Sequence, residues 1–243
     1  MTRYGLIGRS LGHSFSPGYF AEKFQRLGIR ARYDAFELET IDQVDRLRRM
    51  DDLAGFNVTI PYKQAILDHL DAVDDEAAAV GAVNTVAVRG GRWIGYNTDV
   101  TGFAESLAPL LGDVHTKALI LGTGGASRAV AHVLRRWEMQ VVFVSRTKQA
   151  EDVIGYRDID RSVLTDFLLI VNTTPVGQHP DIDATPLENP DGIGGLHVVF
   201  DLVYNPDPTR LMREASQRGA TARGGREMLE LQAEAAWGVW HHH

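Results

Sequence analysis

The segment Lys117-Ala-Leu-Ile-Leu-Gly-Thr-Gly-Gly-Ala-Ser127 decides the fold class of this 243-residue chain. Its first five residues form an apolar strand pattern, which runs directly into a Gly-x-Gly turn and then a helix pattern over 128–137. Gly122 permits a tight turn, and Gly124 and Gly125 allow a ligand to approach the backbone closely. Because the amides of such a helix start can bind a pyrophosphate, the segment predicts a dinucleotide-binding βαβ unit. The alternative is a purely structural glycine turn.

The next strand pattern, 141–144, ends in the basic turn Ser145-Arg146-Thr147-Lys148. Folds that bind NAD usually carry Asp or Glu at this point, where it binds the ribose hydroxyls. A guanidinium, an ammonium and hydroxyls instead suit a ribose 2′-phosphate, because charge-assisted contacts to a dianion are strong. The turn therefore favours NADP over NAD, with a solvated basic turn as the alternative.

Strand and helix patterns alternate along the rest of the chain. We expect strands at 4–7, 31–36, 55–60, 168–171 and 198–202, a hairpin of 83–88 with 93–96 around Gly90-Gly91, and helices at 17–27, 41–50, 65–80, 100–111 and 228–240. This rhythm predicts an α/β protein with a mainly parallel sheet and two domains. The first would comprise residues 1–99, completed by a C-terminal helix at 225–240, and the second, of Rossmann type, residues 100–224. Residues 241–243, three histidines, resemble the remnant of an affinity tag.

Composition excludes several classes of function. The formal net charge of −7 argues against a nucleic-acid backbone or an anionic membrane as the main partner. The absence of cysteine excludes disulfides, thiolate metal sites and cysteine nucleophiles. No apolar run approaches the roughly 20 residues of a membrane span. We therefore expect a cytoplasmic protein, monomeric or homodimeric, that acts on a small molecule and uses no metal.

The segment Asn57-Val-Thr-Ile-Pro-Tyr-Lys63 indicates proton-transfer chemistry. Val58 and Ile60 alternate with an amide and a hydroxyl, so we expect the apolar pair to pack and the polar pair to face a ligand. Pro61 ends the strand and leaves Lys63 on a fixed turn. A lysine beside small polar groups suits proton transfer to a hydroxylated substrate, whereas the alternative is a solvated surface lysine.

Three further polar clusters lie at the edges of the first hundred residues. They are His13-Ser14-Phe15-Ser16-Pro17, Gly81-Ala-Val-Asn84-Thr85 and Asn97-Thr98-Asp99. Each alone is explained as a helix cap or turn, and only their occurrence together with Lys63 favours a binding site.

These motifs resemble those of the shikimate dehydrogenase family. HSFSP, NVTIPYK, GAVNT, NTDVTGF, GTGGAS, SRT, NTTPVG, DLVYNP and MLELQA occur in the family's order over nearly the whole chain. The resemblance implies an N-terminal parallel or mixed α/β substrate domain plus a Rossmann-type NADP-binding domain. It also implies reduction of 3-dehydroshikimate to shikimate with NADPH in aromatic amino-acid biosynthesis. Rival hypotheses are a broader quinate/shikimate dehydrogenase, a folate-linked dehydrogenase and a non-catalytic ligand sensor.

The resemblance also implies roles for individual residues. The catalytic pair would be Lys63 and Asp99. Substrate-binding residues would be Ser14, Ser16, Asn57, Thr59, Asn84 and Gln232, with Tyr204 lining the site. Cofactor contacts would come from Gly122, Gly124, Gly125, Ala126, Arg146 and Thr147, with Ser145 and Lys148 completing the basic turn and Gly225 and Met228 near the nicotinamide.

The chain departs from the family pattern in a few places. Ser145 stands where Asn is usual, and Gln178 stands where Met is common. The stretch between Lys148 and Asp166 is short, so we expect residues 151–163 to form little more than one irregular element. This shortening would affect cofactor affinity more than the chemistry.

Overall fold

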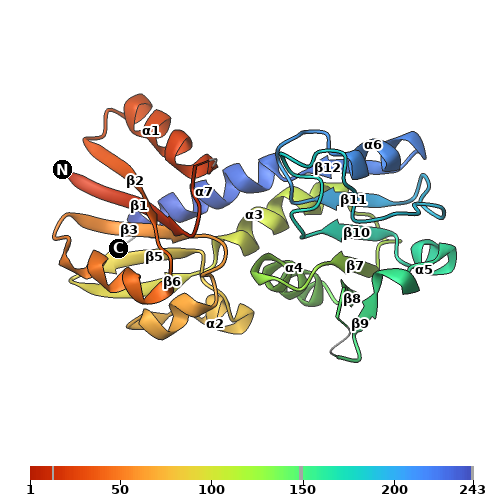
Figure 1. Cartoon of the computed structure of the whole chain (residues 1–243), viewed down its shortest axis with the longest axis horizontal. Coiled ribbons are helices and arrows are strands. Elements are labelled where there is room, and N and C mark those ends of the chain that lie inside the picture. Colours follow the sequence, from red (N-terminus) through yellow and green to blue (C-terminus); the bar gives the residue numbers. More distant parts are fainter. Residues whose placement is uncertain (13, 148–149, 242–243) are drawn as a thin grey trace. The chain divides into compact units, whose positions relative to one another are not determined.

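The protein folds into two compact units in a computed structural model that describes residues 1–12, 14–147 and 150–241 (Figure 1). The first unit comprises Met1–Thr98 together with the C-terminal residues from Gln232, and the second comprises Asp99–Leu231. The chain passes between the units inside two helices, α3 (Thr98–Leu107) and α7 (Arg226–His241). The observed division therefore lies beside the expected boundary at 99, but it assigns residues 226–231 of α7 to the second unit.

The first unit is built on a mixed sheet of six strands in the order β2-β1-β3-β5-β6-β4. The strands are β1 (Thr2–Gly8), β2 (Ala31–Glu37), β3 (Leu53–Val58), β4 (Ala72–Val73), β5 (Thr85–Arg89) and β6 (Arg92–Tyr96). β1 is parallel to β2 and β3, whereas β5 is antiparallel to both β3 and β6. Gly90 and Gly91 join β5 to β6 with φ values of 56° and 79°, which suits the two-residue turn of a tight hairpin. The predicted mixed sheet with a hairpin near one edge is confirmed.

Two helix predictions in this unit are wrong in detail. Residues Ile41–Arg49 form a 3₁₀ helix, η1, because the apolar residues Ile41, Val44 and Leu47 recur every third position. The predicted helix at 65–80 is instead a 3₁₀ helix η2 (Ala65–His69), the short strand β4 and a helix α2 (Asp75–Val80). It is interrupted because the Asp71 carboxylate accepts a 2.7 Å hydrogen bond from the Trp93 amide and ties the chain to β6.

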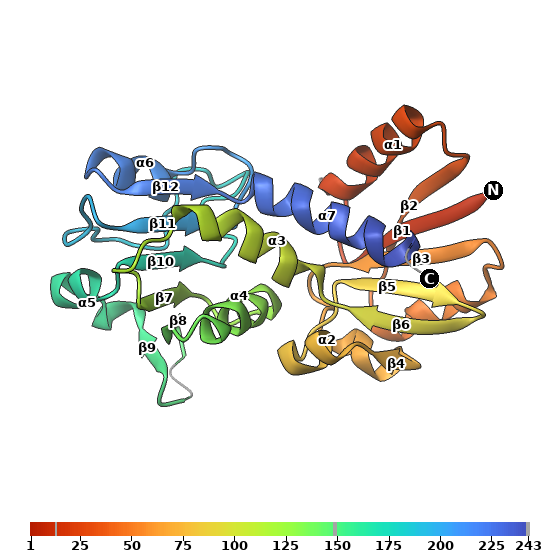
Figure 2. The same cartoon turned by 180° about the vertical axis from the view of Figure 1, so that it is seen from behind.

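The helix α1 (Phe15–Leu27) and the C-terminal half of α7 cover one face of this sheet, and η1, η2 and α2 cover the other (Figure 2). The expected apolar stripe of α7 is present, with Ala233 and Ala236 fully buried. Trp240 lies at the end of that stripe and donates a 3.0 Å hydrogen bond from Nε1 to the Val86 carbonyl. Its ring lies directly over Gly55, where a Cβ atom would come within 2.3 Å of Nε1.

We therefore expect Gly55→Ala to destabilise the protein by about 1–3 kcal/mol, the cost of overpacking a filled core. The matched control is Gly18→Ala in α1, where an added Cβ would meet no atom within 4 Å. It should stabilise the protein by about 0.5–1 kcal/mol, because alanine is the better helix former. Denaturant unfolding of both variants measures the difference, and equal effects would contradict the packing that we describe.

The second unit is built on a parallel sheet of six strands. Their order across the sheet is β12-β11-β10-β7-β8-β9, as the strand labels in Figure 1 show. The strands are β7 (Lys117–Leu121), β8 (Gln140–Ser145), β9 (Val153–Gly155), β10 (Leu169–Asn172), β11 (Val198–Asp201) and β12 (Thr221–Gly224). Every neighbouring pair is parallel. Counted from β7 this is the 3-2-1-4-5-6 order of the Rossmann fold, with the switch point between β7 and β10. The predicted fold class is confirmed.

The helices of the second unit are α3, η3 (Ala108–Leu110), α4 (Gly125–Arg136), η4 (Tyr156–Asp158), α5 (Arg161–Asp166), α6 (Arg210–Gln217) and the first residues of α7. The expectation of one irregular element at 151–163 is wrong, since this stretch holds β9, η4 and the start of α5. Asp160 makes the compact arrangement feasible because its carboxylate caps α5, accepting from the Val163 amide at 2.9 Å. The sequence reasoning missed β12 and α6. β12 (Thr-Ala-Arg-Gly) has no apolar run.

No helix in the described part of the chain combines the length and apolarity that crossing a bilayer requires.

A buried carboxylate joins the loops that follow β10 and β11. Asp201 accepts hydrogen bonds from Asn172 Nδ2 at 2.8 Å, from the Val203 amide at 3.0 Å and from the Thr209 hydroxyl at 2.7 Å. Burial raises the pKa of Asp201 to about 6, although these three hydrogen bonds oppose the rise. One fully buried group therefore holds both loops against the edge of the sheet.

This pKa predicts how stability changes with pH. Because the folded protein holds the Asp201 proton up to about pH 6, while the unfolded chain releases it near pH 4, the stabilisation is complete below about pH 4 and is lost as the pH rises through 6. The loss should be roughly 2–3 kcal/mol, at about 1.4 kcal/mol per pKa unit. Asp201→Asn removes the titration, so denaturant unfolding at pH 4.5 and 7 should show a smaller decrease in this variant than in the unmodified protein. If the free energy of unfolding fell equally with pH in both proteins, the raised pKa of Asp201 would be contradicted.

Candidate active site

Three of the predicted substrate residues belong to one hydrogen-bond network in the first unit, and a fourth, Ser16, lies beside it. Ser16, Asn57, Asn84 and Gln232 come from α1, β3, the residue before β5 and α7, and each is at most 8% exposed. Asn57 Nδ2 donates to the Asn84 carbonyl at 3.2 Å, and Asn84 Nδ2 donates to Gln232 Oε1 at 3.4 Å. Tyr33, which donates to Asn57 Oδ1 at 2.7 Å, is the member of the network next to Ser16. The structure therefore brings together residues that are up to 216 positions apart in the sequence, from Ser16 to Gln232.

Asn84 lies at the centre of this network. Its Oδ1 accepts from the Thr98 amide at 2.7 Å, and its Nδ2 also donates to the Thr98 hydroxyl at 3.0 Å. Thr98 begins α3 and directly precedes Asp99, which is buried in the first turn of that helix. Asn84 thus fixes the backbone from which the predicted catalytic carboxylate extends.

Backbone hydrogen bonds hold Lys63 beside Asn84. The Val83 amide donates to the Lys63 carbonyl at 2.7 Å, and the Val58 amide donates to the Asn84 carbonyl at 2.8 Å. Lys63 is half-buried. The backbone of Lys63 is therefore bonded to the segment that leads into Asn84. A lysine that was only a solvated surface residue would not need this fixed position.

The expectation for Ile60 is wrong. β3 ends at Val58, and the Tyr62 amide bonds back to the Thr59 carbonyl at 2.9 Å, so the alternation of a strand stops at this turn. Ile60 is consequently 72% exposed and does not pack. Thr59 is half-buried, with its amide bonded to the Ile7 carbonyl at 2.9 Å.

Ser14 occupies the N-cap position of α1, but its side chain makes no capping hydrogen bond. The first turn of α1 contains no acidic residue, so its positive end is not neutralised from within the helix. The simple capping interpretation therefore fails for Ser14. The neighbouring His13 lies outside the described residues.

The glycine turn of the second unit lies at the switch point of the sheet. Gly122 has φ +105° and donates to the Val144 carbonyl at 2.8 Å, while Thr173 donates to the Leu121 carbonyl through its amide at 2.9 Å and its hydroxyl at 2.7 Å. A Cβ atom at Gly122 would come within 2.9 Å of the Thr173 hydroxyl, so only glycine fits between the two loops.

The start of α4 fits a pyrophosphate. Gly124 is the N-cap, no side chain caps the helix, and a Cβ at Gly124 would meet no atom within 4 Å. No acidic residue occupies the first turn, which includes Gly125 and Ala126. Ser127, in the third motif position, is buried and donates to the Gly124 carbonyl at 2.6 Å, which tightens the turn. Free amides at a positive helix end with open space above them are the groups that a dinucleotide requires.

The basic turn at 145–148 begins at the end of β8. It lies next to the glycine turn, because the Gly122 amide donates to the carbonyl of Val144 in β8. Ser145 Oγ accepts from the Thr147 amide at 3.3 Å, and Arg146 and Thr147 are exposed. Burial raises the pKa of Tyr156, and the positive charge of Arg146 opposes this rise. The predicted contact Lys148 lies outside the described residues.

Gly225 has a structural role that the sequence did not reveal. A Cβ at this position would lie 2.2 Å from the Leu202 carbonyl oxygen, so the backbone before α7 packs directly on the end of β11. Met228 is buried one turn later, and Tyr204 is half-buried, with its pKa raised by burial. A role for Gly225 at the nicotinamide is not needed to explain why glycine occupies this position.

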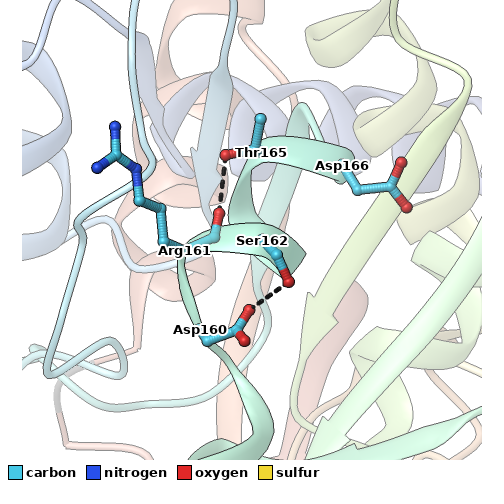
Figure 3. Close-up of a pocket in the computed structure, with 5 residues that line it drawn as sticks. All are labelled: Asp160, Arg161, Ser162, Thr165 and Asp166. Atoms are coloured by element: carbon cyan, nitrogen blue, oxygen red, sulfur yellow. Dashed lines mark hydrogen bonds between the residues drawn. The ribbon is translucent and has the colours of Figure 1, made fainter.

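A shallow hollow on α5 contains none of the predicted residues. It is lined by Asp160, Arg161, Ser162, Thr165 and Asp166 (Figure 3). Ser162 donates to Asp160 at 2.7 Å, Thr165 donates to the Arg161 carbonyl at 2.7 Å, and Asp166 forms an ion pair with Lys117 at 2.8 Å. These polar groups hold α5 in place, and we assign no ligand to them.

The sequence reasoning missed Tyr33, Thr85 and Thr98 as members of the network. Thr85 follows Asn84 in the motif GAVNT, and Thr98 precedes Asp99 in NTDVTGF. These positions within the motifs could have indicated that both threonines belong to the site. Tyr33 gave no signal, because it reaches Asn57 only through the sheet order β2-β1-β3.

Comparison with known proteins gives a consistent answer. Residues 6–86 match the family model described as the shikimate dehydrogenase substrate binding domain. The NADP⁺ shikimate dehydrogenase of Shouchella clausii is 37% identical over 99% of this chain and 93% of its own. Shikimate 5-dehydrogenase from Thermus thermophilus, solved with NADP(H) and shikimate, superposes with a TM-score of 0.87 at 36% identity, over 99% and 94% of the two chains.

Quinate dehydrogenase from Corynebacterium glutamicum, solved with NAD, superposes with a TM-score of 0.88 at 28% identity, over 99% of this chain and 93% of that one. Sequence identity is therefore higher with the shikimate enzymes than with this quinate enzyme. Because the 37% identity extends over nearly the full length of both chains, this protein belongs to the shikimate dehydrogenase family.

Proposed function

We propose that this protein catalyses the reversible NADPH-dependent reduction of 3-dehydroshikimate to shikimate. The observation that carries the proposal is the buried network of Asn57, Asn84 and Gln232 with Ser16 beside it, together with the backbone hydrogen bond to Lys63 from Val83, the neighbour of Asn84 in the chain. Buried amides and hydroxyls grouped in this way suit a small ligand with several hydroxyl groups, because an unpaired polar group in such a site costs binding free energy.

The substrate contacts would come mainly from hydroxyl and amide groups. Ser14 and Ser16 lie at the positive end of α1, which favours an anionic group such as the carboxylate of shikimate. Thr59, Tyr204 and Gln232 would contact the ring and its hydroxyls. Asn84 would join them by exchanging its long 3.4 Å bond to Gln232 for one to the substrate, while keeping its 3.0 Å bond to Thr98. Asn57 has a different role, since its two amide hydrogens already bond to the Asn84 carbonyl and the Thr85 hydroxyl. Its N–H groups hold Asn84 and do not bind substrate.

Reduction of a ring ketone requires a hydride at carbon and a proton at oxygen. NADPH, when bound, supplies the hydride. The Lys63 ammonium would stabilise the developing alkoxide and donate the proton, and Asp99 would accept hydrogen bonds that orient the ammonium and a substrate hydroxyl. Asn84 supports both residues through the backbone, because it holds Thr98 and lies beside the Lys63 turn.

The residues of the second unit fit the cofactor. The amides at the start of α4, with Gly122, Gly124, Gly125 and Ala126, would bind the pyrophosphate. Ser145, Arg146, Thr147 and Lys148 would contact the ribose 2′-phosphate, and Met228, with Gly225 before it, would lie near the nicotinamide. The open space at Gly124 and the exposure of Arg146 support these contacts.

A quinate/shikimate dehydrogenase of broader specificity is the second candidate, favoured by the structural similarity to a quinate dehydrogenase. Initial rates with shikimate and quinate, each with NADP and NAD, distinguish the two candidates. Turnover of shikimate with NADP, at a much higher kcat/KM than any other pair, is the expected result. Comparable values for quinate would favour the broader enzyme, and no turnover with either substrate would favour a ligand sensor.

Lys63→Ala should lower kcat for shikimate oxidation by about 10²–10⁴-fold with a smaller change in KM, because general acid–base catalysis is lost. Lys117→Ala is the matched control, since this lysine begins β7, at the opposite end of the strand from the glycine turn, where it pairs with Asp166 of α5, and its loss should leave kcat unchanged. Steady-state kinetics of both variants make the comparison. A near-normal kcat for Lys63→Ala would refute the catalytic assignment.

Arg146→Ala should weaken NADP binding by about 1.5–3 kcal/mol, the range of a hydrogen bond to a charged group, and leave NAD binding nearly unchanged. Arg157→Ala removes an exposed positive charge from nearby η4 and controls for the general electrostatic effect. Titration calorimetry with each cofactor gives the dissociation constants. Equal losses for NADP and NAD would show that Arg146 only supports the fold.

A further inference from the structure

Tyr33 is a member of the polar network that lies outside both the expected site residues and the sequence motifs that carry them. It lies on β2, and its ring stacks on Phe20 of α1 with a centroid distance of 4.8 Å and an interplanar angle of 11°. The residue is half-buried, and burial raises the pKa of Tyr33 far above its ordinary value. The phenol therefore stays protonated and acts as a fixed donor.

The Tyr33 hydroxyl connects two elements of the substrate site. It donates to Asn57 Oδ1 at 2.7 Å, and the Ser16 side chain lies beside it. Because the phenol donates its single proton to Asn57, its oxygen is left as an acceptor for Ser16. One hydroxyl group thus orients Asn57 and offers an acceptor to Ser16.

Asn57 passes this constraint to the centre of the site. With Oδ1 held by Tyr33, its amide plane is fixed, and Nδ2 is directed at the Asn84 carbonyl at 3.2 Å and the Thr85 hydroxyl at 3.0 Å. Thr85 in turn donates to Asn84 Oδ1 at 3.1 Å. An amide that could flip would exchange a donor for an acceptor facing Thr85 and would break these bonds.

We propose that Tyr33 is a positioning residue for the substrate site. Its hydroxyl holds Asn57, which holds the Asn84 carbonyl directly and the Asn84 side chain through Thr85, and it offers an acceptor to Ser16, so that these groups are oriented before the ligand arrives. Pre-orientation of this kind improves binding, because less ordering remains to be completed when the ligand binds. The inference rests on the proposed function, since it concerns the residues that would bind shikimate.

Tyr33→Phe tests the proposal, because it removes the hydroxyl and keeps the ring that stacks on Phe20. We expect KM for shikimate to rise about five- to twentyfold, kcat to change less than threefold, and KM for NADP to stay the same. Trp240→Phe is the matched control. Trp240 belongs to the same unit and loses the 3.0 Å hydrogen bond from Nε1 to the Val86 carbonyl while an aromatic ring is kept, so the melting temperature should fall comparably while KM for shikimate is unchanged.

A double-mutant cycle with Ser16→Ala provides a readout that a merely structural role would not change. If Tyr33 orients Ser16, the effect of Ser16→Ala on KM should be smaller in the Tyr33→Phe background than alone. Additive effects, or an unchanged KM in Tyr33→Phe, would overturn the inference while leaving the proposed function intact. Absence of shikimate turnover in the unmodified protein would refute the proposed function and this inference with it.

Discussion

The side chain of Asn84 is the group on which the arrangement of the first unit depends. A buried amide must satisfy its donors and acceptor within the protein, and Asn84 does so with Thr85, Thr98 and Gln232. These partners belong to β5, α3 and α7, so one residue fixes three elements at a single point. Leaving such a group unpaired costs about 1–3 kcal/mol, which makes the alternative packings unfavourable. The same bonds align the groups that we assign to substrate binding.

The second unit depends on close backbone contacts as well as on side-chain bonds. Gly122 and Gly225 lie where a single Cβ atom would collide with a neighbouring loop or strand end. Asp201 joins the loops after β10 and β11 through three hydrogen bonds, at the cost of burying a carboxyl group. The edge of the sheet at the switch point is therefore rigid, whereas the start of α4 and the Arg146 turn are left accessible. Rigid loops beside accessible amides are a suitable combination for holding a long cofactor in one position.

Local patterns predicted much of this fold because they reflect local physics. The strand and glycine turn at 117–125 and the glycine pair at 90–91 require particular backbone angles, and both form as expected. The predictions failed where distant contacts override the pattern. The carboxylate of Asp71 interrupts the expected helix at 65–80, and a turn after Val58 leaves Ile60 exposed. The segment 151–163 was underestimated because its capping residue, Asp160, was not recognised.

The sequence by itself determined the fold class, the presence of a dinucleotide-binding βαβ unit, the family and the identity of most candidate site residues, because motifs such as NVTIPYK and GTGGAS carry that information in a few adjacent positions. Only the tertiary structure decided what those residues do for one another. It showed that the hydrogens of Asn57 are used within the protein, that Gly225 is required for packing, and that Tyr33 reaches the site across a neighbouring strand. The physical reason is that hydrogen bonds and steric contacts depend on distances between chain segments. Those distances are set by the order of strands in the sheet, which neighbouring residues in the sequence do not record.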